Sequence, residues 1–272
     1  MNQTERRQFL IQELLKEQDG YRHLEVPKQE EEQKRLLRGL MNIRPACRIS
    51  KEVLQIQDAY LTEETVRKGI THSDELDPIQ PGIYLWKGDI TTLACDAIVN
   101  AANSGMTGCY VPNHRCIDNC IHTFAGMELR LECDRIMREQ GYEEPTGQAK
   151  LTPAYNLPCR YILHTVGPIV TGQIDENGLC LVSELLSILS GTGGRKWPGK
   201  CGILLCFNRG VWVSEGRSSA DRSTVGAGIY EECDKCKEGD IQCFSGRRSG
   251  NLQQNPQGRQ NGCTVCLMRR ML

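Results

Sequence analysis

The first eighty residues carry apolar positions at three- and four-residue spacing, a pattern that predicts helices. FLIQELL and RLLRGLM show this spacing, and the charged run QEEEQKR between them is typical of a solvated face. A further helix is expected after Ser50, whose side chain can cap KEVLQIQDAYL. We therefore expect residues 1–80 to form an amphipathic helical extension that packs on a domain.

The pattern changes at Pro81, where short apolar runs begin to alternate with a helix. GIYLWKGDI, AIVNAAN, AKLTPA and YILHTV predict strands. The segment CIHTFAGMELRLECDRIMREQG predicts one amphipathic helix, with an apolar face at Ile121, Phe124, Leu129 and Ile136. This alternation favours an α/β sheet with crossover helices, which bind ligands in loops past the carboxyl ends of strands. The polar loops GDIT and NAAN both take that position.

After about Asn177 the periodicity decays. LVSELLSIL is the only good periodic segment there, and SGTGGRKWPGK and EGRSSADRS lack sustained apolar spacing. Composition therefore predicts a poorly ordered tail over residues 178–272.

Charge and cysteine content narrow the class of function. The 272 residues include 33 basic and 34 acidic side chains, with a formal net charge of −1. Proteins that bind nucleic acids or anionic membranes usually carry an excess of positive charge, so we expect neither as a partner. No apolar run approaches the roughly 20 residues that span a bilayer, and we expect no signal peptide. The 15 cysteines then indicate a reducing cytoplasm, free thiols and a candidate metal site.

The segment GCYVPNHRCIDNCIH gathers several metal-type ligands. Cys109, His114 and Cys116 lie on a loop ahead of the helix, where the backbone can fold around one ion. Cys120 and His122 are expected to be helical and to point elsewhere. Zinc favours thiolate and imidazole ligands, and three protein ligands leave the fourth position open, as in catalytic sites. Spacing alone leaves a zinc site and chance cysteines equally open.

Two polar loops are candidates for ligand binding, and two histidines are candidates for catalytic bases. Asp89 in KGDIT can accept hydrogen bonds from an amino group such as that of adenine, although a cap of an Asx-type turn is the more common role. Asn100 and Asn103 in VNAANS can contact sugar hydroxyls or merely cap the loop. His122 and His164 are expected to be core or structural histidines rather than bases.

These segments, taken in order, resemble a macrodomain. GDIT, IVNAANS, the Cys/His loop with CIDNCIHTFAGMELR, PTGQAKLTPAYNLP and YILHTVGP are similar to the zinc-containing subgroup of protein-ADP-ribosyl hydrolases. LLRGLMNIRP and EVLQIQDAYL resemble the N-terminal extension of that subgroup, so the likeness covers roughly residues 35–176. It implies a three-layer α/β/α fold with a mixed sheet, with residues 81–177 as the N-terminal half of the macrodomain.

The resemblance also implies a ligand site. Asp89 and Ile90 would hold the adenine end of ADP-ribose, and Ile117 and Asp118 would line the ligand loop. Asn103 and Asp118 would face the distal ribose, where the glycosidic bond is cut, and Asp118 would orient or deprotonate a water.

The resemblance further implies that Cys109, His114 and Cys116 bind one zinc ion, which can bind a ribose hydroxyl or activate a water. The implied activity is zinc-dependent hydrolysis of ADP-ribose from mono-ADP-ribosylated protein side chains, with ADP-ribose and ADP-ribosylated protein as partners. The alternative is a non-catalytic ADP-ribose-binding module, which needs no open metal position.

The resemblance fails in the tail. A second phosphate loop is expected there, and SGTGG imitates it weakly, with no helix after it. Reading the codons from Leu189 onward one nucleotide later can yield strings that resemble the missing helix, phosphate loop and last strand. The sequence thus predicts a frameshift near Asn177 to Val182 and a tail that cannot supply the remaining strands. An unstable chain with little or no activity would follow.

The tail also contains two CxxC pairs, Cys233 with Cys236 and Cys263 with Cys266. Such pairs would ordinarily indicate a zinc ribbon, and an interaction protein built on one is the third alternative. If the frame is shifted, the pairs are accidental.

Overall fold

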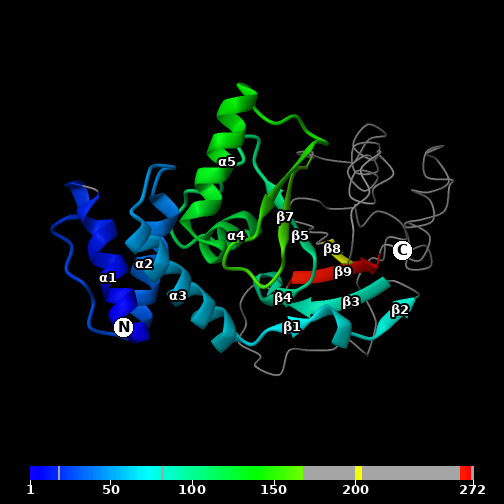
Figure 1. Cartoon of the computed structure of the whole chain (residues 1–272), viewed down its shortest axis with the longest axis horizontal. Coiled ribbons are helices and arrows are strands. Elements are labelled where there is room, and N and C mark those ends of the chain that lie inside the picture. The colour runs from blue at the N-terminus through cyan, green and yellow to red at the C-terminus, as the bar shows by residue number, and fades with distance from the viewer. Residues whose placement is uncertain (18, 81–82, 168–199, 204–263, 271–272) are drawn as a thin grey trace, which may run out of the picture.

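The computed structural model describes residues 1–17, 19–80, 83–167, 200–203 and 264–270. Figure 1 shows two parts lying side by side: a group of helices at the N-terminus and a sheet with further helices against it. None of the helices in these ranges is both long enough and apolar enough to cross a membrane.

The helical spacing near the N-terminus is confirmed. Within residues 1–70 the structure has α1 (Gln3–Lys16), a short turn η1 (Asp19–Tyr21), α2 (Glu30–Ile43) and α3 (Lys51–Lys68). Ser50 caps α3 as predicted, because its side chain accepts a hydrogen bond from the backbone N–H of Val53 at 3.2 Å. Leucines and isoleucines of α1 to α3 form one buried cluster, which also includes Met127 at the start of a later helix. The extension therefore packs on the rest of the chain.

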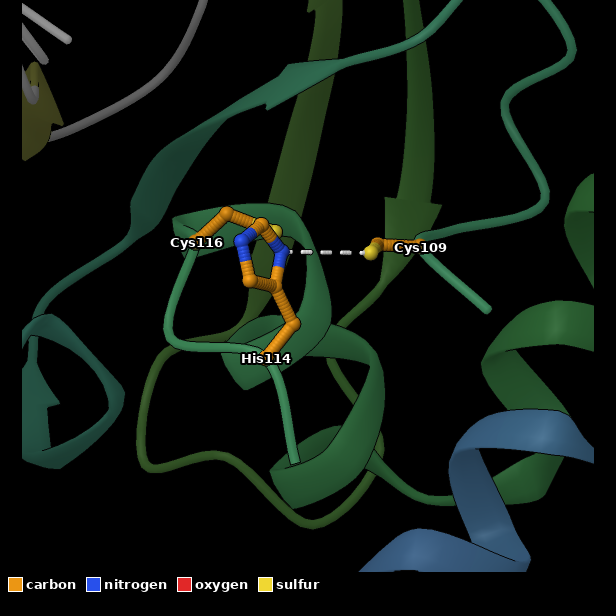
Figure 2. Close-up of side chains that lie close together, drawn as sticks. All are labelled: Cys109, His114 and Cys116. Carbon is orange, nitrogen blue, oxygen red and sulfur yellow. Dashed lines mark hydrogen bonds between the residues drawn. The ribbon is translucent and has the colours of Figure 1, made fainter. Parts of the chain in front are cut away.

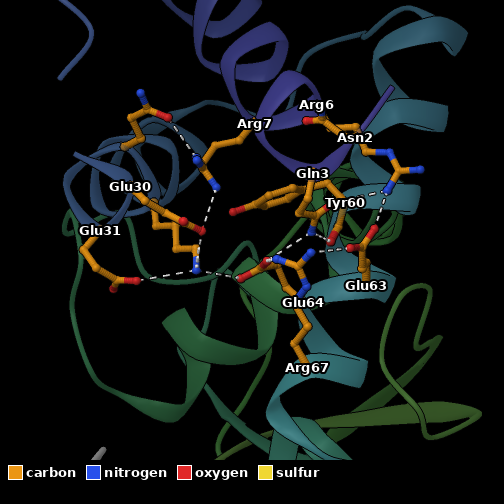
Figure 3. A network of polar contacts seen from close by, with 12 residues as sticks. Asn2, Gln3, Arg6, Arg7, Glu30, Glu31, Tyr60, Glu63, Glu64 and Arg67 are labelled. Carbon is orange, nitrogen blue, oxygen red and sulfur yellow. Dashed lines mark hydrogen bonds and ion pairs between the residues drawn. The ribbon is translucent and has the colours of Figure 1, made fainter. Parts of the chain in front are cut away.

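A polar network also joins the three helices, as Figure 3 shows. Arg7 of α1 is buried, and its Nε donates to Oε1 of Gln33 in α2 at 3.0 Å. Gln3 of α1 donates to the backbone carbonyl oxygen of Tyr60 in α3 at 2.8 Å. Because buried polar groups need partners, this network fixes how the helices pack.

The last ten residues of the predicted extension are not helical. They contain β1 (Thr71–His72), the turn η2 (Ser73–Glu75) and β2 (Pro78–Gln80). β1 pairs in parallel with β4 (Leu93–Ala94), and β2 pairs antiparallel with β3 (Ile83–Gly88). The prediction of helix over residues 71–80 is therefore wrong, because pairing with later strands decides the structure there.

A mixed sheet is confirmed. Seven strands within the described ranges follow the order β2-β3-β9-β8-β5-β7-β6. The strands not yet named are β5 (Ala97–Ala102), β6 (Ala149–Pro153), β7 (Tyr161–Val166), β8 (Lys200–Ile203) and β9 (Thr264–Arg270). β5 runs parallel to β7 and β8, whereas β6, β9 and β3 pair antiparallel with their neighbours. The predicted strands GIYLWKG, AIVNAA, AKLTP and YILHTV are thus β3, β5, β6 and β7.

Strands β8 and β9 correct one expectation about the tail. β9 lies between β3 and β8, and β8 lies beside β5, so both complete the middle of the sheet. The prediction that the tail cannot supply the remaining strands is wrong for these two segments, because their backbones pair with β3 and β5. The remainder of the predicted tail lies outside the described residues.

The predicted long helix is two helices, α4 (Ile117–Ala125) and α5 (Met127–Gln140). The break is at Gly126, whose φ of 102° is a conformation that favours glycine. A Cβ at this position would lie 2.7 Å from Nε2 of Gln57 and 2.9 Å from Nδ2 of Asn156. Backbone conformation and space therefore both require glycine here.

Helices α4 and α5 pack on one face of the sheet. Ile121 and Leu129 from the helices meet Ile98 and Ile162 from the sheet in one buried cluster. Val99 follows Ile98 in β5, so its side chain points to the opposite face, yet it is also buried. Side chains of β5 are therefore buried on both faces of the sheet, and α4 and α5 form the helical layer that the described residues show on one of them.

Candidate functional site

The candidate site lies where β5 ends and the following loop leads into α4. Three residues of this loop have positive φ: Met106 at 57°, Gly108 at 86° and Asn113 at 56°. These turns fold the loop back on itself ahead of α4, which begins at Ile117. Cys116 caps this helix, because its Sγ accepts from the backbone N–H of Asn119 at 3.4 Å.

The three predicted metal ligands come together. Figure 2 shows Cys109, His114 and Cys116 facing one another, and their ligand atoms all lie within 4.8 Å of one another. Sγ of Cys109 is 3.4 Å from Nδ1 of His114. Tetrahedral zinc places neighbouring ligand atoms about 3.3–3.8 Å apart, so a small closure of the loop would suffice. Two thiols and one imidazole are a donor set that suits zinc.

The Cys116 thiol is partly buried, and this affects its charge. Burial raises the pKa of the Cys116 thiol to about 12, and the neighbouring Cys109 and Asp118 act in the same direction. A thiol in these surroundings needs a cation close by to become a thiolate.

Asp118 lies in the first turn of α4 and is buried. Its Oδ1 accepts a hydrogen bond from Nδ2 of Asn100 at 2.8 Å, and its Oδ2 lies 3.4 Å from Nδ2 of Asn103. Burial raises the pKa of the Asp118 carboxyl to about 6, although the Asn100 hydrogen bond and the positive charge of Arg130 oppose the rise. The carboxylate is therefore held between the two asparagines that the sequence singled out.

The two asparagines differ in exposure. Asn100 is fully buried, and its Nδ2 also lies 3.0 Å from Nδ1 of His164, so it cannot contact a sugar. Asn103 is exposed, and its Nδ2 donates to the backbone carbonyl oxygen of Gly108 at 3.2 Å. Asn103 can therefore reach a ligand, whereas Asn100 positions Asp118.

His164 and His122 are buried, as the sequence predicts for core histidines. Nε2 of His164 lies 3.0 Å from Oγ1 of Thr152, and its Nδ1 faces the amide of Asn100. Because that amide donates, Nδ1 accepts and Nε2 carries the proton. Burial lowers the pKa of His164 to about 3. Both nitrogens are thus engaged, which disfavours metal binding by the buried group of His122, Cys133 and His164.

The buried ring of His122 packs against the backbone of the Cys/His loop at Gly108. A Cβ at Gly108 would lie 2.6 Å from the His122 ring, so the backbone of the loop rests directly on this imidazole. Burial lowers the pKa of His122 well below its usual value, and His164 and Arg130 add to the shift. A neutral structural ring fits the prediction for His122.

The predicted adenine site is a capped turn. Oδ1 of Asp89 accepts from the backbone N–H of Thr91 at 3.0 Å and caps the turn η3 (Ile90–Thr92). Its Oδ2 lies 3.2 Å from Nζ of Lys68, at the end of α3. Burial opposes ionisation of Asp89, but Lys68 and Thr91 outweigh it and hold the pKa of this carboxyl below its usual range. The Asx-type cap is therefore present, and the carboxylate is ionised.

The two predicted isoleucines differ in burial. The side chain of Ile90 is buried in the core between sheet and helices, so a contact of Ile90 with the adenine end of ADP-ribose would have to come from its backbone. The apolar side chain follows the turn inward because Asp89 caps it. Ile117 is half-buried and packs against the same core, at the start of α4.

Sequence reasoning missed the residues that reach the site from far along the chain, above all Arg38 and Lys68. Their contacts join residues 81 and 21 positions apart, and no local pattern indicates such pairs. The weak phosphate-loop candidate at residues 190–194 lies outside the described residues, and so do Cys233, Cys236 and Cys263. Cys266 lies in β9, where it pairs with Trp86 of β3.

Comparisons with known proteins identify the family. Residues 99–190 match the macro domain family. A protein-ADP-ribose hydrolase of Treponema medium is 51% identical over 228 residues, which cover 81% of this chain and 86% of that protein. A protein-ADP-ribose hydrolase of Staphylococcus aureus (strain MRSA252) is 49% identical over 164 residues, or 60% of this chain and 61% of that protein.

Among solved structures, the Trypanosoma brucei macrodomain is similar to 73% of this chain and 82% of its own, with 26% identity and a TM-score of 0.44. The chain belongs to the macro domain family, as the match to the family and the relative from Treponema medium show.

The same comparisons bear on the position of the predicted frameshift. The family match continues to residue 190, and the match to the Treponema medium protein is longer than residues 1–177 could supply. The similarity to the family thus extends beyond the predicted interval of residues 177–182. The frameshift itself stays a prediction.

Proposed function

We propose that the site performs zinc-dependent hydrolysis, which releases ADP-ribose from mono-ADP-ribosylated protein side chains. The observation that carries this proposal is the position of Asp118. This buried carboxylate lies two residues after Cys116, beside a converging set of two thiols and an imidazole. The names of the two relatives, both protein-ADP-ribose hydrolases, support the choice of reaction.

Cys109, His114 and Cys116 would hold the zinc ion. When bound, an ion with three protein ligands supplies Lewis-acid chemistry at its open position. One ion per chain is expected, because in the buried group of His122, Cys133 and His164 both ring nitrogens of His164 already face Asn100 and Thr152.

We assign to Asp118 the role of orienting the attacking water and accepting a proton from it. Its pKa of about 6 leaves it ionised at neutral pH yet still able to accept a proton. The N-terminus of α4 stabilises the negative charge, and Asn100 fixes the orientation of the carboxylate. Asn103, which is exposed beside it, would contact the distal ribose.

The adenine end of ADP-ribose is assigned to Asp89 and the backbone of Ile90. Both oxygens of Asp89 already accept hydrogen bonds, from Thr91 and Lys68. A carboxylate offers about four acceptor positions, so an adenine amino group can still be accommodated. We propose a cytoplasmic location, because thiol ligands must stay reduced.

The alternative function is a binding module that recognises ADP-ribose without cleaving it. Such a module would need Asp89 and Asn103 but neither the metal ligands nor Asp118. The two functions are separated by assaying ADP-ribose release and ADP-ribose binding on the same protein. Hydrolysis requires that Cys116→Ala abolish release while binding persists, whereas a pure binder shows binding alone in both proteins.

For this chain we propose a low turnover, because the second phosphate loop expected of the family is missing from the sequence of its tail. The explanation offered is the predicted change of reading frame, after which shifted strings from Leu189 onward resemble the missing part of the family. The coding DNA tests it: an intact frame that encodes the same tail in several related genes would contradict it.

A further inference from the structure

Helix α2 of the N-terminal extension contacts the Cys/His loop directly. Nη2 of Arg38 donates to the backbone carbonyl oxygen of His114 at 2.7 Å, and the same nitrogen lies 3.0 Å from Oδ1 of Asn119. His114 is one of the three candidate ligands, and Asn119 lies in the first turn of α4. Arg38 therefore joins a ligand-bearing segment to the helix that carries Asp118.

A second contact comes from Asn42, four residues further along the same face of α2. Its Oδ1 accepts from the backbone N–H of Asn113 at 2.9 Å, and its Nδ2 donates to Oγ1 of Thr123 in α4 at 2.8 Å. Asn113 has a φ of 56°, a left-handed conformation that is unfavourable without support. The side chain of Asn42 is buried, so it supplies this support from a fixed position.

Helix α2 and the Cys/His loop lie so close together that neither can move far toward the other. A Cβ at Gly39, which lies between the two contacts in sequence, would come within 3.1 Å of Nδ2 of Asn113. The helix backbone and the loop are thus in close contact.

The far end of α2 is fixed by Arg130 of α5. Nη1 of Arg130 donates to the backbone carbonyl oxygens of Asn42 at 2.8 Å and Met41 at 3.2 Å, and Nε donates to that of Thr107 at 2.8 Å. The last carbonyls of a helix lack partners within it and carry the negative end of its dipole, so a guanidinium is favourable here. The ring of Tyr110, in the Cys/His loop, lies 4.3 Å from the same guanidinium.

We propose that Arg38 and Asn42 are positioning residues of the metal site, which keep the backbone around Asn113 and His114 where the His114 imidazole faces Cys109 and Cys116. This inference rests on the proposed zinc site. The N-terminal extension is then part of the metal site rather than a separate appendage. Groups that orient metal ligands commonly contribute about 10- to 100-fold to metal affinity.

The charge of Arg38 affects zinc binding less than its contacts do. A guanidinium repels a metal cation but favours the thiolates that bind it, and zinc binding with release of two thiol protons leaves the net charge of the site unchanged. Removal of the charge alone would therefore change the affinity little, whereas loss of a positioning contact would weaken it. The size of the change in affinity separates the two effects.

The first experiment measures zinc affinity of the full chain by competition with a chromophoric chelator. We expect Arg38→Met and Asn42→Ala to bind zinc at least about 10-fold more weakly than the wild type, and Arg38→Lys to recover part of the loss. Arg35→Met is the matched control, because Arg35 is an exposed arginine on the same helix. Equal or tighter zinc binding by Arg38→Met would overturn the proposal.

The second experiment needs no metal. Hydrogen exchange of the backbone amides of residues 109–116 is compared in the metal-free proteins. We expect faster exchange in Arg38→Met and Asn42→Ala, with protection in α1 and α3 unchanged as evidence that the variants fold. If the wild type binds no zinc, the proposed metal chemistry fails, yet the exchange still decides whether α2 positions the loop. Unchanged exchange in both variants would overturn the inference.

Discussion

Asn100 in β5 donates one hydrogen bond to the carboxylate of Asp118, with 2.8 Å between Nδ2 and Oδ1. The same amide nitrogen lies 3.0 Å from Nδ1 of His164 in the neighbouring strand. One buried side chain therefore fixes both the proposed catalytic carboxylate and a core histidine. Because Asn100 is fully buried, we expect it to act on the proposed site only through Asp118.

Replacement of Asn100 tests this arrangement. Asn100→Ala leaves Nδ1 of His164 and one oxygen of Asp118 without partners in the buried site. We expect the free energy of unfolding to fall by about 1–3 kcal/mol. Urea denaturation measures it, with Asn103→Ala as the control, because Asn103 is exposed and should lose less. Equal losses for the two variants would show that the buried amide has no special role.

The metal site predicts which cysteines matter. Elemental analysis of the purified chain should find one zinc ion, and Cys109→Ala, His114→Ala or Cys116→Ala should each remove it. Cys133→Ala should retain the ion, because Cys133 is a buried thiol whose pKa burial raises to about 12. Two ions per chain would favour a second site in the tail, and zinc that survives all three ligand replacements would contradict the assignment.

The ion pair of Lys68 and Asp89 predicts a dependence of stability on pH. The folded state holds the pKa of Asp89 below its unfolded value of about 3.9, so the ionised carboxylate stabilises the fold above that pH. This contribution is lost as the pH falls through the folded pKa. Since both side chains are partly exposed, Lys68→Met should cost about 1 kcal/mol or less at pH 7.

Chemical denaturation from about pH 2 to 7 measures this difference, which should shrink toward acid pH. Lys16→Met provides a control, because Lys16 is an exposed lysine of α1. A difference between the wild type and Lys68→Met that stays constant over this pH range would mean that the pair with Asp89 is not its cause.

At Gly126, between α4 and α5, even a small side chain should lower the free energy of unfolding considerably. Gly126→Ala adds a Cβ at a φ of 102°, within 2.7 Å of Gln57 and 2.9 Å of Asn156. We expect a loss of about 1–3 kcal/mol of unfolding free energy from strain and overpacking. Gly141→Ala is informative beside it, because Gly141 has a positive φ of 80° but no atom within 4 Å of the added Cβ. A smaller loss for Gly126→Ala than for Gly141→Ala would contradict the packing argument.

The sequence predicts the parts of this fold that depend on local pattern. The strands β3, β5, β6 and β7 and the three candidate ligands Cys109, His114 and Cys116 are each contained in a short segment. The break at Gly126 is hidden, because apolar spacing continues through it, and the positive φ and the contacts with Gln57 and Asn156 that require the glycine appear only in the folded chain.

Burial and distant contacts account for the rest. Asn100 and Asn103 are alike in sequence, and only their burial separates a positioning residue from a ligand contact. Arg38 reaches the site from α2, and β9 reaches β3 from the opposite end of the chain. Contacts between residues so far apart in the sequence depend on the tertiary structure, and no local sequence pattern predicts them.

The central claim is zinc-dependent release of ADP-ribose at the site of Asp118. The most direct measurement compares ADP-ribose release from a mono-ADP-ribosylated protein, with zinc and after chelation. The assay compares two proteins. One is the 272-residue chain, and the other, called the shifted version, is encoded by the same gene with its reading frame moved by one nucleotide after residue 190. We predict release by the shifted version that disappears on chelation and in Cys116→Ala, with little or none from the original chain. Release that persists without zinc, or its absence in the shifted version with zinc bound, would contradict the account.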